Sequence, residues 1–288
     1  MELSLGTVQF GVVYGLSGAT TLLSDQQVRE ILELAFERGI RSLDTAPAYG
    51  DIESRLGGLC EGLDFQIVSK ISAIPGGYDQ SSACQWSINS ATTSRERLGQ
   101  KLKALLFHRA EDLTGERGSA VWSAAIRWAS ASTIALGASA YEVDVIRAAC
   151  RTHPIAIAQL PGSALDQRFR VPFSELASPP RLQLRSAFLQ GLLLLPVEVA
   201  TQAVRGSSAA LQKWHAWLKR RALPPMQGAF SIVKAFEGVE TCVVGVDNLL
   251  QLRELTDAWA EATPICAGEL ACDDLEIIDP RKWSRQPK

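Results

Sequence analysis

Four side chains of the kinds that transfer protons and polarise carbonyl groups occur in order along the sequence: Asp44, Tyr49, Lys70 and His108. A tyrosine hydroxyl has a pKa of about 10, so it is a poor acid or base at neutral pH unless a neighbour changes that pKa. The ammonium of Lys70 would lower it by favouring the phenolate, and Asp44 would hold Lys70 in place. Tyr49 would then act as general acid when a carbonyl is reduced and as general base when an alcohol is oxidised. His108 would orient and polarise the carbonyl oxygen.

Each of these four residues, which we call the candidate tetrad, has a simpler explanation when it is taken singly. An aspartate after a strand is usually a turn or helix-capping residue, and a lysine at a strand end is usually solvated. A histidine on an apolar strand usually belongs to the core, and a lone tyrosine usually packs against its neighbours. The hypothesis of shared chemistry therefore depends on a fold that brings all four together.

The chain alternates short runs of β-forming residues with amphipathic helices, which indicates βα units and a parallel sheet. Eight strands are predicted, at Leu3–Val8, Ile40–Ala46, Phe65–Ile71, Ala104–His108, Thr133–Ser139, Ile155–Leu160, Arg181–Phe188 and Glu240–Val244. The predicted helices include Ser24–Arg38, Ile52–Glu61, Glu142–Arg151, Ala209–Ala222 and Leu249–Trp259. Ser24, followed three residues later by Gln27, has the capping-box pattern of a helix start.

Eight strands alternating with helices predict a closed parallel (β/α)8 barrel, the TIM barrel, as one domain over residues 1–288. An open doubly wound sheet is the alternative, but no Gly-x-Gly-x-x-Gly follows the first strand. Barrel enzymes carry their active sites at the carboxyl ends of the strands. The candidate tetrad falls at three such ends, after the second, third and fourth strands.

Composition and charge exclude several other classes of function. The formal net charge is −2 and no basic run stands out, so nucleic-acid binding is not expected. No segment approaches the roughly 18 apolar residues of a membrane span, and the first residues lack a signal-peptide pattern, so we expect a cytoplasmic protein. The six cysteines form no Cys-x-x-Cys pair and the three histidines are far apart, so no metal site is predicted.

One continuous segment makes a more specific resemblance visible. Residues 39–53, GIRSLDTAPAYGDIE, resemble the aldo-keto reductase signature G-I-x-x-x-D-T-A-x-x-Y-G-x-x-E. Lys70 and the Phe107-His108-Arg109 strand end fit that family in order and spacing, and the resemblance extends from Leu5 to Trp283. It implies hydride transfer with NAD(P)H to a small-molecule carbonyl, or from an alcohol. Residues 188–193 and 278–283 resemble a subgroup from bacterial surface-polysaccharide clusters, which implies a sugar substrate and a place in carbohydrate metabolism.

The resemblance also implies residues that hold the nicotinamide. In the family, Ser and Asn after the fifth strand and Gln on the sixth bind its carboxamide; Ser139 and Gln159 match, but Ala140 replaces the Asn. An aromatic residue after the seventh strand normally stacks on the nicotinamide ring. Arg185 aligns there, followed by Ser186, and Phe188 would supply the ring instead if the register shifted.

The loop after the eighth strand implies the cofactor type. Family members that prefer NADP often place Arg or Lys soon after the glycine that corresponds to Gly245, where this chain has Asp247. A carboxylate would repel a 2′-phosphate and could accept a ribose hydroxyl, as acidic residues do in NAD sites. Gln251 is assigned to the same nucleotide contact. In a simpler interpretation, Asp247 or Asn248 caps the helix that starts near Leu249, which is compatible with a cofactor role.

Three functions remain open from the sequence. The first is an NAD(P)-dependent oxidoreductase, the second is a barrel enzyme that uses the same residues for elimination or epimerisation, and the third is a regulatory binding module. The substrate pocket is expected to have variable loops as walls. Phe10, Tyr14 and Trp86 are candidate wall aromatics, with core packing as the alternative for each. The sequence does not define the oligomeric state.

Overall fold

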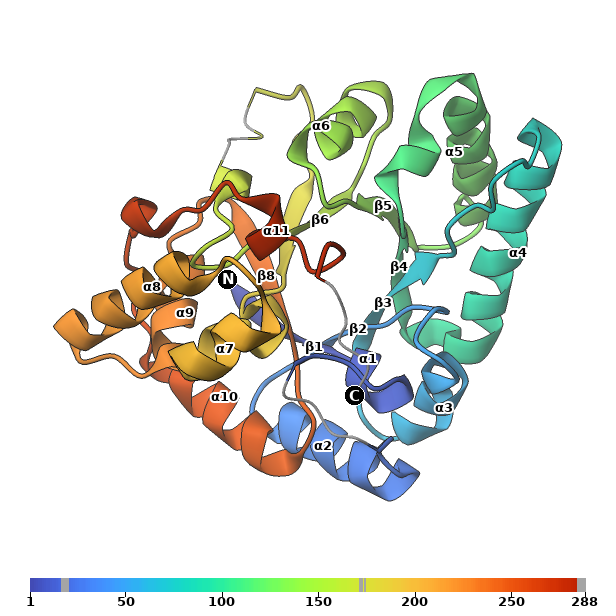
Figure 1. The fold of residues 1–288 in the computed structure, drawn as a ribbon. Helices are drawn as coiled ribbons and strands as arrows, with labels where there is room; N and C mark the ends of the chain where they lie inside the picture. The colour runs from blue at the N-terminus through green and yellow to red at the C-terminus, as the bar shows by residue number, and fades with distance from the viewer. Residues whose placement is uncertain (17–20, 171–172, 174, 284–288) are drawn as a thin grey trace.

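Eight parallel strands close into a barrel in the computed structural model, which describes residues 1–16, 21–170, 173 and 175–283 (Figure 1). Each strand pairs with its neighbours in chain order, and β8 returns to pair with β1. The prediction of a (β/α)8 barrel is therefore confirmed. The strands are β1 (Glu2–Gly6), β2 (Ser42–Asp44), β3 (Gln66–Ile71), β4 (Leu102–Phe107), β5 (Ala135–Ser139), β6 (Ile157–Pro161), β7 (Arg181–Arg185) and β8 (Val239–Gly245).

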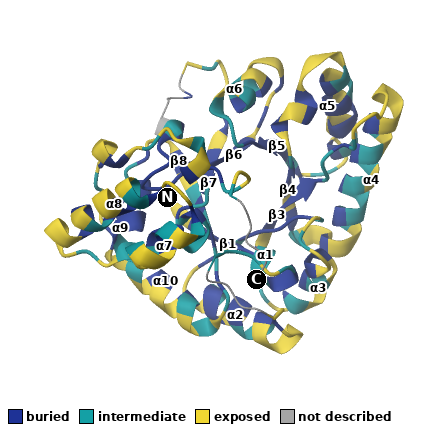
Figure 2. Cartoon of the chain, viewed as in Figure 1, coloured by how far each residue is buried: buried dark blue, intermediate teal, exposed yellow. Residues whose placement is uncertain are grey.

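Helices surround the barrel, with their buried faces toward the strands and their exposed faces outward (Figure 2). Those of four residues, α1 (Val8–Gly11) and α11 (Leu275–Ile278), lie near the two ends of the chain. Ser24 and Gln27 form the predicted capping box at the start of α2. The longer helices are α2 (Asp25–Glu37), α3 (Ile52–Leu59), α4 (Gln80–Leu98), α5 (Gly115–Ala129), α6 (Val143–Thr152), α7 (Val197–Ala203), α8 (Ser208–Arg221), α9 (Pro225–Lys234) and α10 (Leu249–Glu261).

A small apolar cluster of Val68, Ala104, Leu106 and Ile157 is separate from the main core between strands and helices. Successive side chains on a strand point to opposite faces, so residues two apart share a face. Two positions after Val68, Leu106 and Ile157 come Lys70, His108 and Gln159, respectively. The cluster therefore forms an apolar floor, and polar groups stand above it at the carboxyl ends of the strands.

The signature segment has a structural part as well as a chemical one. Glu53 is fully buried on α3 and accepts hydrogen bonds from Ser69 on β3 (2.5 Å) and Ser94 on α4 (2.8 Å), and it forms an ion pair with Arg97 (3.2 Å). These contacts join α3, α4 and β3 behind the tetrad. The buried carboxylate thus has partners on all sides, as a buried charge requires.

Two strands differ most in length from the prediction. The strand predicted over 40–46 is regular only at Ser42–Asp44, although the N–H of Thr45 still donates to Val68. The strand predicted over 181–188 ends at Arg185, so its last three residues were placed wrongly. Ser186 has a φ of 67°, in the left-handed region, which a strand cannot accommodate. The chain turns there instead, at the edge of the barrel mouth.

None of the helices in the described ranges has both the length and the hydropathy needed to cross a bilayer. Within the same ranges, no group of three or more His, Cys, Asp or Glu side chains is arranged to hold a metal ion.

Candidate active site

One cavity of about 520 Å³ opens at the carboxyl ends of the strands. Its wall includes every residue predicted for the site: Asp44, Tyr49, Lys70, His108, Ser139, Gln159, Arg185, Ser186, Gly245, Asp247 and Gln251. The barrel thus brings together side chains that span some two hundred positions of the sequence.

The signature loop is fixed by close backbone packing beside Tyr49. Gly50 has a φ of 67°, and a Cβ atom there would meet the carbonyl oxygen of Gly11. A Cβ atom on Gly11 would in turn collide with the carbonyl of Tyr49. Both positions therefore require glycine, and their contact sets where the Tyr49 side chain leaves the loop.

Lys70 and Asp44 form a buried ion pair in the floor of the cavity. The Nζ of Lys70 lies 2.6 Å from Oδ2 of Asp44 and donates a second hydrogen bond, of 3.1 Å, to the carbonyl of Thr45. Gln159 also donates to Oδ2 of Asp44, at 2.7 Å. The side chains of Lys70 and Asp44 are only 1% and 7% exposed, respectively, so each charge depends on the other for compensation. Burial lowers the pKa of Lys70, and the Asp44 carboxylate opposes that shift.

Tyr49 and His108 face each other above this pair, with ring centroids 6.3 Å apart and ring planes at 89°. Burial raises the pKa of Tyr49, and the negative charge of Asp44 raises it further. Burial also lowers the pKa of His108 to about 4, with the charge of Lys70 as the next cause. Both side chains are therefore neutral at pH 7, which leaves a phenol and an imidazole directed into the cavity.

The expectation that Lys70 lowers the pKa of Tyr49 is wrong for this structure, because that pKa is raised. Among the described residues, the ammonium of Lys70 hydrogen-bonds to Asp44 and Thr45, not to the Tyr49 hydroxyl. Its charge is balanced by Asp44, whereas the charge that opposes the rise at Tyr49 belongs to Arg185. The ion pair therefore supplies little net positive charge to the phenol.

The other end of the cavity is built from the loops after β1 and β8. The side chain of Gln9 lies against Gly245, where any Cβ atom would collide with the Gln9 amide. The Oε1 of Gln9 is buried and has no hydrogen-bond partner. A bare glycine surface beside an unpaired buried acceptor fits a bound molecule that carries hydroxyl or amide donors, as a dinucleotide does.

The hydrogen bonds at the start of α10 show which residue caps this helix. Oδ1 of Asn248 accepts from the N–H of Gln251 at 2.9 Å, so Asn248 is the helix cap. The Gln251 side chain accepts from the N–H of Asp247 at 2.7 Å. The Asp247 carboxylate does not take part in the cap and stands, half-buried, in the cavity wall, which Glu254 also lines. Among the described residues of that wall, the basic side chains are Lys70 and Arg185. Both lie close enough to His108 to lower its pKa.

The sequence model of the aldo/keto reductase family matches residues 2–265. The chain belongs to this family. The aldo/keto reductases are NAD(P)-dependent oxidoreductases, and the chain is an enzyme of this type. No curated protein sequence matches it.

Solved structures of aldo/keto reductases share the fold. One, from Bacillus halodurans in its holo form, is 20% identical with a TM-score of 0.70, over 93% of this chain and 89% of that chain. A Pseudomonas aeruginosa protein assigned to the same reductases is 24% identical with a TM-score of 0.64, over 90% and 89% of the two chains. At these identities the likeness establishes the fold alone.

This aldo/keto reductase departs from the family pattern at the end of β7. Arg185 stands where the resemblance to the family implies an aromatic residue, and its guanidinium lies 4.1 Å from the ring centroid of Tyr141. Phe188 also lines the cavity, but it packs against Phe230 with ring centroids 4.9 Å apart. Ser186, Leu189 and Gln190 all have positive φ angles without being glycine. Such a cluster of strained residues is typical of a ligand-binding loop.

Sequence reasoning missed several cavity residues, Gln9 and Tyr141 among them, and placed the aromatic walls incompletely. Tyr14 lines the cavity as one alternative predicted, whereas Phe10 is fully buried in the core. The Nε1 of Trp86 donates to backbone carbonyls outside the cavity. Gln9 and Tyr141 each follow the end of a strand, so their position at the rim was the available signal.

Proposed function

We propose that this enzyme reduces the carbonyl group of a small molecule, or oxidises the matching alcohol, with Tyr49 as the acid or base. The observation that carries the proposal is the placement of a neutral phenol and a neutral imidazole over a buried Asp44–Lys70 ion pair. All four line one cavity with the residues that suit a dinucleotide. The geometry offers two donors to one oxygen atom, which is what carbonyl reduction requires.

The residues in the wall divide into two tasks. Ser139 and Gln159 would hold the nicotinamide end of NAD(P)H, and Gln9, Gly245, Asp247 and Gln251 the adenosine end. The cofactor, when bound, supplies the hydride. Ser186 would contact it from the β7 loop, whereas Arg185, which the resemblance assigns to the same contact, has a guanidinium that could also reach the substrate.

In the reductive direction, the substrate oxygen would accept hydrogen bonds from the Tyr49 hydroxyl and from an N–H of His108. The raised pKa of Tyr49 keeps its proton in place until negative charge develops on that oxygen. His108 remains neutral down to a pH of about 4, so it donates a hydrogen bond without carrying a charge. Because the pKa of Tyr49 is raised, oxidation of an alcohol would become efficient only at alkaline pH, where the phenol loses its proton.

We further propose that the substrate is a sugar carbonyl, as the resemblance of residues 188–193 and 278–283 implies. We also propose that the enzyme acts in the cytoplasm, as expected from the lack of a signal-peptide pattern in its first residues. We also propose that NADH binds at least as well as NADPH. The support for this preference is Asp247, a carboxylate where a 2′-phosphate would approach. Family membership favours redox catalysis over the elimination, epimerisation and regulatory alternatives that the sequence left open.

The test compares the unmodified protein with Tyr49→Phe, and with Tyr78→Phe as a control outside the cavity. Purified protein is incubated with aldehydes and aldehydic sugars, and oxidation of NADH or NADPH is followed by absorbance. Tyr49→Phe should lower kcat by at least about 10²-fold, the scale of a removed general acid. Its affinity for NADH, titrated by tryptophan fluorescence, should remain close to that of the unmodified protein.

Two results would contradict this proposal. Near-normal turnover by Tyr49→Phe would exclude Tyr49 as the acid. Failure of both nucleotides to bind the unmodified protein would contradict the cofactor contacts proposed above.

A further inference from the structure

We propose that Arg185 binds an oxyanion of the substrate, so that the cavity selects carbonyl compounds bearing a carboxylate or a phosphate. This inference rests on the proposed function and narrows its substrate class. It starts from the position of the side chain. Arg185 is half-buried at the end of β7 and lines the same cavity as Tyr49 and His108.

The guanidinium of Arg185 has only neutral partners among the described residues. It donates to the carbonyl of Ala140 at 3.2 Å and makes a longer contact of 3.4 Å with the Ser186 hydroxyl. None of the ion pairs formed by the described residues includes Arg185. A guanidinium carries five N–H donors in a planar fork that matches carboxylate and phosphate groups. Most of its donor capacity is therefore free to bind a ligand.

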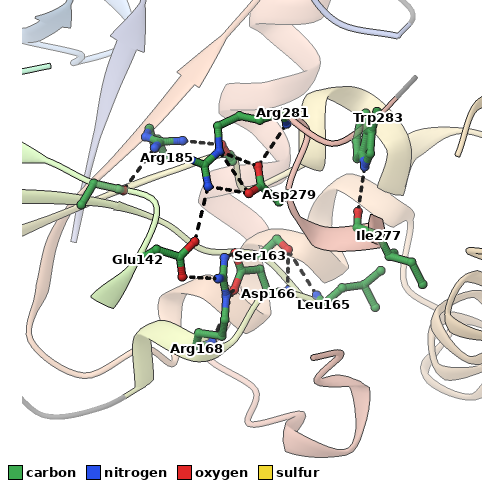
Figure 3. Close-up of polar contacts among 12 residues, drawn as sticks. Glu142, Ser163, Leu165, Asp166, Arg168, Arg185, Ile277, Asp279, Arg281 and Trp283 are labelled. Carbon is green, nitrogen blue, oxygen red and sulfur yellow. Dashed lines mark hydrogen bonds and ion pairs between the residues drawn. The ribbon is translucent and has the colours of Figure 1, made fainter. Parts of the chain in front are cut away.

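Neighbouring arginines are paired, which makes Arg185 an exception within its own surroundings (Figure 3). Arg281 forms ion pairs with Asp279 at 2.5 Å and with Glu142 at 3.4 Å. Arg168 likewise pairs with Asp166 at 2.9 Å and with Glu142 at 3.2 Å. The carboxylates of this region thus compensate two arginines and leave the third without a counter-ion. A partly buried charge without a counter-ion is costly, and a ligand that supplies one would remove that cost.

Tyr141 holds Arg185 in place. Its ring centroid lies 4.1 Å from Cζ of Arg185 and 3.7 Å from Cζ of Arg281, both within the range of cation–π contacts. Because Arg281 belongs to the segment after α11, the carboxyl-terminal part of the chain supports the ring from outside the cavity. The guanidinium of Arg185 is therefore presented by a rigid contact, which favours its use in recognition.

The charges at this end of the cavity agree with an anionic ligand. Asp44 and Lys70 balance each other and His108 is neutral, so Arg185 leaves a net positive charge beside the reacting groups. That charge is close enough to act on both groups. It opposes the rise in the pKa of Tyr49 and adds to the fall in the pKa of His108. A neutral substrate would leave this charge uncompensated, whereas an oxyanion near the carbonyl would neutralise it.

The experiment uses matched pairs of aldehydes that differ in charge: 4-oxobutanoate with its methyl ester, and glyceraldehyde 3-phosphate with glyceraldehyde. The ratio of kcat/KM within each pair is measured for the unmodified enzyme, Arg185→Met, Arg185→Lys and Arg253→Met. Arg253 is an exposed arginine outside the cavity wall, so its variant controls for net charge. NADH affinity is titrated for every protein by tryptophan fluorescence.

We expect the unmodified enzyme to prefer the anion in at least one pair by about tenfold or more, the scale of a charge-assisted hydrogen bond. Arg185→Met should bring that ratio close to one, chiefly through KM, while Arg185→Lys keeps part of it and Arg253→Met keeps all of it. Preference in the first or second pair identifies the oxyanion as carboxylate or phosphate.

Other outcomes overturn the inference. Equal use of both members of each pair would overturn it while leaving the proposed function intact. An Arg185→Met enzyme that keeps its charge preference but binds NADH weakly would show that Arg185 holds the cofactor instead. If no aldehyde is reduced by any protein, the proposed function fails, and this inference fails with it.

Discussion

The two ends of the cavity differ in how their charged side chains are compensated. At the catalytic end, a buried cation and a buried anion compensate each other 2.6 Å apart, and the groups above them are held neutral by burial. At the nucleotide end, Asp247 and Glu254 line the wall without a basic residue among their described neighbours in that wall. The charged residues at the catalytic end depend on one another, whereas no ion pair among the described residues joins Asp247 or Glu254 to a partner.

This difference explains why the tetrad keeps the pattern that the resemblance implies, whereas position 247 departs from it. Replacing either member of the Asp44–Lys70 pair would strand a charge inside the barrel, so the pair is constrained as a unit. Asp247 instead sits on a loop before α10, where Asn248 already provides the cap. Position 247 is therefore free to vary with the cofactor, because the helix does not need its side chain.

The largest effect should come from removing the charge on which Asp44 depends. Lys70→Met leaves the Asp44 carboxylate buried with Gln159 as its remaining side-chain donor. We expect a loss of about 3–5 kcal/mol in the free energy of unfolding, the cost of breaking a buried ion pair on one side. Urea unfolding monitored by circular dichroism measures it.

The double variant Lys70→Met with Asp44→Asn supplies the control. It removes both charges and should recover much of the lost stability while remaining inactive. If the double variant were as unstable as Lys70→Met, loss of packing around the lysine stem would be the cause, and the catalytic end would not be a coupled unit.

The next effect concerns His108 and acid. Its pKa is about 4 in the folded chain and 6.5 when unperturbed, so the unfolded chain takes up the proton first as the pH falls. The contribution to stability is complete above pH 6.5, declines as the pH falls from 6.5 to 4, and is constant below that. The difference between these two pKa values corresponds to up to about 3 kcal/mol in the free energy of unfolding. Urea midpoints measured across this range should fall less steeply for His108→Gln than for the unmodified chain; parallel curves would contradict the assignment.

The sequence predicted the barrel and the position of every tetrad residue because both depend on local pattern. Strand-forming runs at regular spacing determine the topology, and the carboxyl end of a strand determines where Lys70 and His108 lie. The direction of the Tyr49 pKa could not be predicted in this way. It depends on burial and on the charges of Asp44 and Arg185, which only the folded chain brings close to the phenol.

The start of α10 shows the same limit at the nucleotide end. Asp247 and Asn248 are both good capping residues, so sequence alone left two candidates for one role. The backbone at Asn248 is extended, and its side chain reaches the N–H of Gln251. The strained turn after Arg185 was also beyond prediction, because Ser186, Leu189 and Gln190 are not residue types that usually adopt positive φ.

A smaller effect is expected where the nucleotide end is given the charge it lacks. Asp247→Arg should shift the ratio of NADPH to NADH affinity toward NADPH by about 1–3 kcal/mol, the scale of a new charge-assisted contact. Fluorescence titration of both nucleotides measures the ratio. Asp273→Arg, at an exposed position outside the cavity wall, makes the same change in net charge and should leave the ratio unaltered. A clear preference for NADPH in the unmodified protein would contradict the role given to Asp247.

The smallest effect separates the cap from cofactor choice. Asn248→Ala removes the acceptor of the Gln251 N–H and should cost about 1 kcal/mol in the free energy of unfolding, as the loss of a helix cap does. Asp79→Ala removes an equivalent cap on α4, where the carboxylate accepts from the N–H of Ser82 at 2.8 Å, far along the chain from the nucleotide loop. The two variants should lose similar stability and keep the same ratio of NADH to NADPH affinity. If Asn248→Ala alone changed that ratio, the cap would help to position Asp247, and the nucleotide end would be coupled in the way that the catalytic end is.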